Sequence, residues 1–429
     1  MTRLLAIALL AAFAAPAFAA SAGAHTPQLV MLGPVPLDFI LFACVLLGIA
    51  LFHHYTFQVA VSGLVVIALY KALVTGTPYG MGIAGVAGVF GHEWITLVNL
   101  FCLLMGFALL SKHFEDSHVP AVIPRYLPAG WKGGFVLLVL IFVLSSFLDN
   151  IAAALIGGTV ASVVFRGKVH IGYLAAIVAA SNAGGSGSVV GDTTTTMMWI
   201  DGVNPLEVLD AYIAAAVALS VFGIVAARQQ DAHAPIVRES TEDVHIDWTR
   251  VGIVAFILVT AITANVVANI WYPKLIDGFP VIGATVVAAI LVSAPLRRPD
   301  WSLIPASLKG TIFLLCLVSC AALMPVEKLP PASWQTTMSL GFVSSVFDNI
   351  PLTALALKQG GYDWGMLAYC VGFGGSMIWF GSSAGVAISN MYPEAKSVGQ
   401  WVKHGWHVTV AYVAGFLLLL WTLGWQPHG

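Results

Sequence analysis

The chain has 429 residues, of which 59% are hydrophobic and only 9% are charged, and its formal net charge is −2. A near-neutral chain lacks the basic surface that nucleic acids require, so a nucleic-acid partner is excluded. Repeated apolar runs of roughly 20 residues, the length that crosses a bilayer as a helix, predict an all-α polytopic membrane protein that lies in the lipid bilayer.

The first twenty residues have the pattern of a secretory signal peptide. Arg3 is followed by a short apolar core and by the small-residue sequence Ala-Phe-Ala-Ala, which ends at Ala20. Cleavage there would leave the mature N-terminus in the periplasm and the protein in a bacterial inner membrane. The alternative is an uncleaved first span, against which the shortness of the apolar core argues.

Ten apolar segments beyond this region are predicted to span the membrane. They lie near 35–51, 57–75, 93–110, 171–200, 207–227, 251–270, 279–296, 306–325, 364–392 and 405–425. Two further segments, 134–165 and 333–357, contain the same Asp-Asn pair, at Asp149-Asn150 and at Asp348-Asn349. A carboxylate is costly at membrane depth, so each pair is expected to have a function.

The basic residues indicate how these two segments enter the membrane. If both are re-entrant hairpins, most Lys and Arg residues fall in cytoplasmic segments. The basic residues that remain outside are Lys71, Lys274, Lys328 and Lys358. If the first segment were a single span, Arg166 and Lys168 would lie outside, and the excess of basic residues on the cytoplasmic side would be lost. Five spans separate the hairpins, so the hairpins enter from opposite sides and the halves form an inverted-topology repeat, as in many secondary transporters.

Each hairpin is followed by a span that small residues interrupt. The sequences are SNAGGSGSVVGDTTTT from Ser181 and GFGGSMIWFGSSAG from Gly372. Aligning the two Gly-Gly-Ser motifs, at 184–186 and 374–376, also aligns Gly191-Asp192-Thr193 with Gly381-Ser382-Ser383. Unwound backbone survives at membrane depth only where it is buried in protein or lines a cavity, so we expect both breaks to line the substrate site. The hydroxyls of residues 193–196 suit either a small cation or the capping of a half-helix.

A phosphate loop or simple helix packing would account less well for these breaks. GSGSVVGDT is loosely similar to a phosphate loop, but Asp192 stands where that motif needs a lysine and would repel phosphate. Small residues also allow close helix packing, which explains Gly372 and Gly374 but not Asp149, Asp192 and Asp348. No nucleophile–base pair, zinc-protease motif or nucleotide motif appears, so we expect neither an enzyme nor a bound cofactor.

A polar stretch between the halves divides the chain. The predicted parts are a signal peptide (1–20), a first transporter repeat with N-terminal spans (30–226), a cytoplasmic linker (227–250) and a second transporter repeat (251–429). Several histidines near predicted membrane boundaries are typical of interfaces, with pH sensing as the alternative. They are His53, His54, His113, His118 and His170.

Four motifs in order resemble those of the ion transporter superfamily. FLDNI with GDTTTTMMWI, and FDNIPL with GSSAGVA, look most like the NhaD-type sodium/proton antiporters, from about Phe101 to the C-terminus. One departure is that the first hairpin lacks the proline found in the second at Pro351. The resemblance implies a homodimer and an elevator-like motion. Carried over by motif, the site residues are Asp149, Asn150, Asn182, Gly185, Asp192, Thr193, Thr194, Asp348, Asn349, Gly375, Ser382 and Ser383.

The charge of the hairpin tips indicates the cargo. Relatives that carry dicarboxylates resemble this chain less, because their tips read Ser-Asn-Thr. Carboxylates without Lys or Arg in the same motifs would oppose an anion, whereas they suit Na⁺, and their burial favours proton uptake when the cation leaves. We therefore predict a Na⁺(Li⁺)/H⁺ antiporter. The residues predicted to hold Na⁺ are Asp149, Asn150, Asp348 and Asn349.

Two alternatives to this prediction remain. One is a sodium-coupled symporter of an organic (di- or tricarboxylate) or inorganic anion on the same fold. The other concerns Asp192 alone, which could simply cap a half-helix N-terminus.

Overall fold

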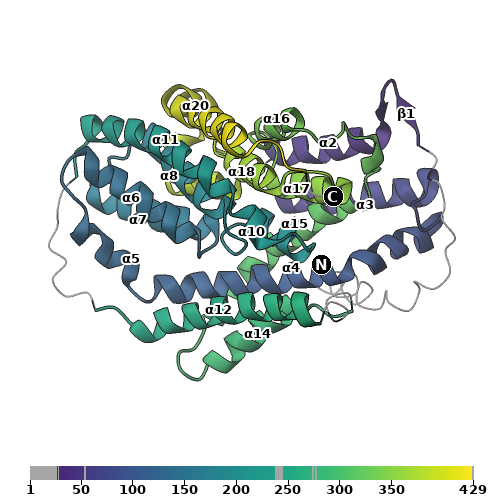
Figure 1. Cartoon of the computed structure of the whole chain (residues 1–429), viewed down its shortest axis with the longest axis horizontal. Helices are drawn as coiled ribbons and strands as arrows, with labels where there is room; N and C mark the ends of the chain where they lie inside the picture. The colour runs from purple at the N-terminus through teal and green to yellow at the C-terminus, as the bar shows by residue number, and fades with distance from the viewer. Residues whose placement is uncertain are drawn as a thin grey trace.

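The computed structural model describes residues 27, 29–52, 55–236, 245–272, 275 and 278–427. The predicted signal peptide, His53, His54 and residues 237–244 of the predicted linker lie outside the described residues. The described part is helical, apart from a two-residue antiparallel hairpin of β1 (Met31–Leu32) and β2 (Val35–Pro36). Figure 1 shows most helices lying roughly along the long axis of the molecule. The all-α class predicted from the sequence is thereby confirmed.

Three helices form the N-terminal part. They are α2 (Leu37–Leu51), α3 (Thr56–Tyr70), which continues as the π-helix η2 (Lys71–Thr75), and α4 (Gly82–Glu115). Asp38 at the start of α2 and Lys71 at the end of α3 form a buried ion pair. A buried charge is tolerated when it is paired, so the pair fixes these two helix ends together. Lys71, which the predicted topology places in an outside loop, lies within a helix.

The next elements run to residue 233. They are α5 (Val119–Val122), η3 (Ile123–Tyr126), α6 (Trp131–Ser145), α7 (Asn150–Val164), α8 (Ile171–Ser186), α9 (Thr193–Ile200), α10 (Pro205–Val208) and α11 (Ala211–His233). The predicted segment 134–165 is interrupted between α6 and α7, and the predicted segment 171–200 between α8 and α9. The first interruption falls on the Asp-Asn pair and the second on the stretch rich in small residues.

The C-terminal elements repeat this order of interruptions. They are α12 (Trp248–Trp271), α14 (Val281–Ser293), η4 (Trp301–Leu303), α15 (Ile304–Ala322), η5 (Val326–Lys328), α16 (Trp334–Ser344), α17 (Asn349–Gln359), α18 (Trp364–Gly374), α19 (Ser383–Met391), η6 (Pro393–Lys396) and α20 (Val398–Leu423). The helical structure is interrupted between α16 and α17 and again between α18 and α19.

The core of the protein is built around α8 and α18. Every residue of α18 is buried, as is every residue of α8 from Gly172 onward. These two helices pack against each other, and both contact α11 and α20. A helix that is apolar on all sides belongs in the interior, so the polar residues that end α8 and α18 lie deep inside the protein.

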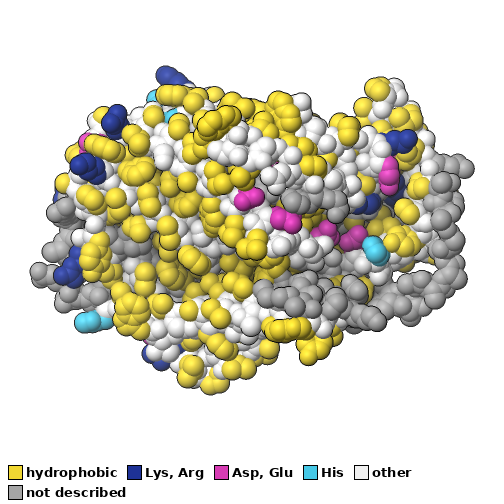
Figure 2. Space-filling view, in the orientation of Figure 1, with side chains coloured by type: hydrophobic (Ala, Val, Ile, Leu, Met, Phe, Trp, Pro, Cys, Tyr) yellow, Lys and Arg dark blue, Asp and Glu magenta, His cyan; other side chains and the backbone are white. Residues whose placement is uncertain are grey.

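The outer surface is apolar. Ile83 is 85% exposed, Trp421 82% and Leu73 76%, and Figure 2 shows hydrophobic side chains over most of the visible face. Five helical stretches within the described residues are long and apolar enough to cross a membrane: Thr56–Thr75, Gly82–Glu115, Pro205–His233, Trp301–Ala322 and Val398–Leu423. An apolar surface of this extent is unfavourable in water and matches lipid. The chain is a multi-pass membrane protein.

Candidate functional site

The two Asp-Asn pairs adopt the same local structure. Asp149 precedes α7 and its Oδ2 accepts the Ile151 N–H at 3.1 Å; Asp348 precedes α17 and its Oδ1 accepts the Ile350 N–H at 3.1 Å. The backbone dihedrals are φ −52°, ψ 140° at Asp149 and φ −51°, ψ 141° at Asp348. A carboxylate at a helix N-terminus satisfies free amides and complements the helix dipole. Capping therefore explains how each Asp is held, through one of its two oxygens.

Asp192 is held differently, by side chains. It precedes α9 and is 3% exposed, yet it makes no side-chain capping bond to that helix within the described residues. Its Oδ1 accepts the Asn150 amide at 3.1 Å, and its Oδ2 accepts the hydroxyl of Thr194. The break before α9 is thus tied to the break before α7.

Asn182 joins the two halves of the chain. It is fully buried in α8, and its Oδ1 accepts the Asn150 amide at 3.1 Å. Its Nδ2 donates to the Ser376 hydroxyl at 2.9 Å and to the Ser382 hydroxyl at 3.1 Å. Both amide protons and the carbonyl are therefore used. One buried network runs from the first Asp-Asn pair to the break between α18 and α19.

The second Asp-Asn pair has fewer partners. The Asn349 side chain is 4% exposed, and its amide nitrogen has no hydrogen-bond partner among the described residues. The Ser383 hydroxyl reaches Asp348 Oδ2 only at 3.4 Å, which is long for a hydrogen bond between oxygens. Ser382 caps α19 by accepting the Gly385 N–H at 3.2 Å. An unsatisfied buried amide is costly, so Asn349 is a candidate ligand-binding group.

The three predicted carboxylates converge. Asp192 is close enough to both Asp149 and Asp348 for the charges to interact electrostatically. None of the three forms an ion pair with Lys or Arg in the described part of the chain. Asp192 is buried, and Asp149 and Asp348 are half-buried. Neighbouring carboxylates without a basic partner attract cations and repel anions.

Glycines allow the segments around the α8–α9 and α18–α19 breaks to contact the C-terminal parts of α6 and α16. A Cβ at Gly184 would lie 2.0 Å from the carbonyl oxygen of Phe142, and one at Gly191 would lie 2.0 Å from that of Ser145. In the second half, a Cβ at Gly374 would lie 2.2 Å from the carbonyl oxygen of Gly341, and one at Gly381 would lie 2.4 Å from that of Ser345. No other residue fits where two backbones approach this closely.

The remaining predicted residues lie at the same breaks. A Cβ at Gly185 would lie 2.8 Å from the Gly191 carbonyl oxygen, and Gly375 has the same relation to Gly381. Thr193, which begins α9, is partly exposed. The structure therefore gathers the predicted residues around two breaks, with Asn182 between them.

Two features of the site are not evident from the sequence. Ser376 accepts a hydrogen bond from Asn182, and its only sequence signal is its place after the second Gly-Gly pair. The hydroxyls of Thr195 and Thr196 donate to backbone carbonyls, including that of Asp192 at 2.9 Å, so they hold the break together and are not free for a cation.

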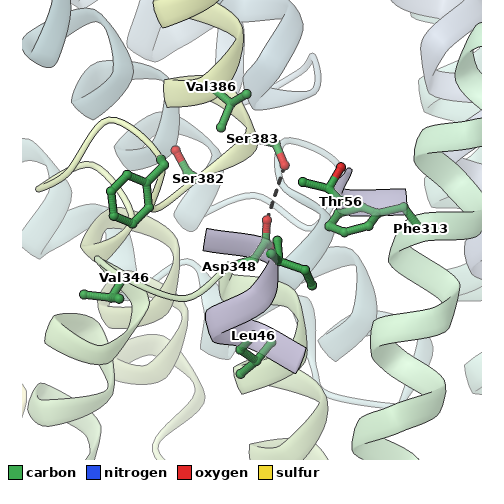
Figure 3. A pocket seen from close by; sticks show the side chains of 10 residues that line it. Leu46, Thr56, Phe313, Val346, Asp348, Ser382, Ser383 and Val386 are labelled. Atoms are coloured by element: carbon green, nitrogen blue, oxygen red, sulfur yellow. Dashed lines mark hydrogen bonds between the residues drawn. The ribbon is translucent and has the colours of Figure 1, made fainter. Parts of the chain in front are cut away.

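A cavity of about 190 Å³ lies beside Asp348. Figure 3 shows Asp348, Ser382 and Ser383 on one side and Thr56 and Phe313 on the other. The lining residues are Leu46, Ile49, Thr56, Phe313, Val346, Asp348, Phe380, Ser382, Ser383 and Val386. The second carboxylate thus faces a space large enough for a small hydrated ion.

Comparisons with known proteins point to one activity. The chain is 26% identical over 337 residues to sodium/proton antiporter 1 of Arabidopsis thaliana, covering 69% of this chain and 55% of the relative. Sodium/proton antiporter 2 of the same plant is also 26% identical, with 69% of this chain and 76% of the relative covered. The Na⁺/H⁺ antiporter NhaD of Alkalimonas amylolytica is 24% identical over 356 residues, 68% of each protein. The chain is a distant homologue of sodium/proton antiporters.

This homology confirms the resemblance found in the motifs. It also confirms that the chain is no enzyme, since the relatives are transporters. No family model matches the chain. The chain spans about half the length of the first of these relatives, so their activity does not transfer to it without an argument from its own residues.

Proposed function

We propose that the protein is a secondary active transporter that exchanges Na⁺ or Li⁺ for H⁺. The observation that carries the proposal is the convergence of Asp149, Asp192 and Asp348 without a basic partner in the described part of the chain. A buried or half-buried carboxylate with another carboxylate nearby is stabilised either by a bound cation or by a proton. Competition between the two at one site is sufficient for antiport.

The neutral oxygens nearby suit a hard cation. Asn150, Asn349, Thr193, Thr194 and Ser382 would supply amide and hydroxyl oxygens beside the carboxylates, and hard cations prefer such ligands. The unsatisfied amide of Asn349 supports this assignment, because rotation of the amide by a half turn would present its oxygen to an ion. Because the carboxylates interact, their protonation is coupled, and the exchanged proton is shared among them and is not assigned to one residue.

We further propose that the two halves form an inverted repeat with two re-entrant hairpins, α6–α7 and α16–α17. At about 1.5 Å per residue, the 11-residue helices α16 and α17 reach only about half of a hydrocarbon core of about 30 Å. In Figure 1 the α6–α7 pair lies toward one end of the long axis, and α16–α17 lies nearer its middle. The shared capping geometry of Asp149 and Asp348 supports the repeat. The bacterial inner membrane, a periplasmic N-terminus and a homodimer belong to the same proposal.

The test is an exchange assay in everted membrane vesicles. Added Na⁺ should dissipate an acid-inside pH gradient when the protein is present. Asp149→Asn and Asp348→Asn should each lower the exchange rate by at least about tenfold, which corresponds to about 1.4 kcal/mol. Asp300→Asn, at an exposed turn before η4, is the matched control and should exchange normally.

Two results would contradict the proposal. One is normal exchange in both Asp→Asn variants at equal protein levels. The other is a wild type that shows no Na⁺ or Li⁺ response at any pH but takes up a carboxylate with Na⁺, which is the symporter alternative.

A further inference from the structure

The helices α2 and α3 reach both ends of α17. At one end, the Asp38–Lys71 ion pair joins the start of α2 to the end of α3, and Lys71 interacts electrostatically with Lys358 near the end of α17. At the other end, Ile49 and Thr56 line the same cavity as Asp348, which precedes α17.

Helix lengths agree with this arrangement. Ten residues separate Asp348 from Lys358, a rise of about 15 Å, and eleven separate Asp38 from Ile49, a rise of about 16 Å. Both distances are near half of the hydrocarbon core of about 30 Å. Ile49 therefore lies about as far from the Asp38–Lys71 pair along α2 as Asp348 lies from Lys358 along α17, which agrees with Ile49 and Asp348 lining one cavity.

Thr56 brings a free hydroxyl to the cavity beside Asp348. It is the first residue of α3, and its hydroxyl has no hydrogen-bond partner among the described residues. At the first position of a helix, the hydroxyl has no carbonyl one turn earlier in that helix to bond, so it is available to the cavity that Asp348 also lines. Leu46 and Phe313 fill the rest of that wall with apolar surface, which leaves Thr56 as the polar group that α2, α3 and α15 contribute to the lining.

We propose that Thr56 is a specificity-determining residue for the small monovalent cation that binds at Asp348. This inference rests on the proposed function. The Asp348 carboxylate and the hydroxyls of Ser382 and Ser383 lie on the opposite wall of the cavity, so Thr56 supplies the oxygen that completes the lining. Its place on a separate helix pair sets the width of the cavity, and the width distinguishes Li⁺ from Na⁺.

The experiment measures how Na⁺ and Li⁺ raise the melting temperature of the purified protein, with choline chloride keeping the ionic strength constant. Thr56→Val keeps the shape and removes the hydroxyl. It should raise the Na⁺ concentration for half-maximal stabilisation about three- to tenfold and change the ratio of the Na⁺ and Li⁺ values. Thr56→Ser should restore the wild-type values. The hydroxyl of Thr285 bonds a carbonyl of its own helix α14, so Thr285→Val is the control and should match the wild type.

The outcomes separate this inference from the proposed function. Wild-type half-maximal concentrations in Thr56→Val, together with a Na⁺ response that Asp348→Asn abolishes, would overturn the role of Thr56 and leave the antiporter intact. A wild type that neither exchanges nor is stabilised by Na⁺ would overturn both. A normal melting temperature of Thr56→Val without salt shows that the variant is folded.

Discussion

The two Asp-Asn pairs share a backbone conformation but differ in their surroundings. Asn150 donates to both Asn182 and Asp192, whereas the amide nitrogen of Asn349 has no partner among the described residues. Asp348 lines a cavity. In the alignment of the two halves, Ser382 of the second half corresponds to Asp192 of the first. The first site is closed by its own hydrogen bonds and the second is open to a ligand.

Matching sequence motifs in the two halves therefore do not determine the hydrogen bonds that each motif makes. Both halves use a capping Asp and close-packed glycines, so the scaffold is the same. Both hydrogen-bond partners of Asn150 differ in the second half, where Asn182 aligns with Gly372 and Asp192 aligns with Ser382. These two differences leave the amide nitrogen of Asn349 without the partners that Asn150 has.

The largest effect is expected from removing the residue that connects the two sites. Asn182→Ala removes one buried hydrogen-bond partner each from Asn150, Ser376 and Ser382, which costs about 1–3 kcal/mol. The melting temperature in detergent should fall by several degrees, and Na⁺-driven exchange should be lost. Ser181→Ala removes a hydroxyl that bonds only within α8 and should behave as wild type. Normal exchange by Asn182→Ala would mean that the two sites work independently.

An intermediate effect is expected at the aligned pair Asp192 and Ser382. Asp192→Asn keeps a partner for Asn150 and removes the charge, so exchange should fall by about tenfold or more with little loss of stability. Ser382→Ala removes the cap of α19, which costs about 1 kcal/mol, and should weaken Na⁺ binding only severalfold. Na⁺ titrations of exchange in vesicles compare the two variants. Equal losses in both would show that the difference between the halves has no functional weight.

The smallest effect is expected at an ion pair that belongs to neither site. Asp247, at the exposed start of α12, accepts a hydrogen bond from Arg297 at 2.8 Å, which lowers the pKa of that carboxyl below its ordinary value. The stabilisation is therefore present above the ordinary pKa and is lost as the pH falls through the lowered one. Melting temperatures of wild type and Arg297→Gln should differ slightly at pH 7 and converge near pH 3, with exchange unchanged at pH 7. A difference that grows on acidification would contradict the assignment.

The sequence predicted the helical segments and the places where they break, because apolar length and glycine clusters are local signals. Asn150 and Asp192 were both predicted as site residues, yet their hydrogen bond joins positions 42 residues apart and follows only from the fold. The bond from Asn182 to Ser376 spans 194 residues and was not foreseen. Helix capping by Asp192 was the alternative to its predicted role in cation binding. In the structure Asp149 and Asp348 make side-chain capping bonds and Asp192 does not, because capping depends on where the amides point. Thr56 was missed because nothing in its sequence context marks it.

The glycines at the breaks also have a mechanical consequence. At Gly184 and Gly191, and again at Gly374 and Gly381, backbone touches backbone with no side chain between. At such a contact no side chain can change its rotamer when one segment shifts, so a shift of one backbone segment displaces the other directly. In the proposed exchange cycle, each Asp-Asn segment and its neighbouring break would therefore move together, and the bending would occur in the connections around them.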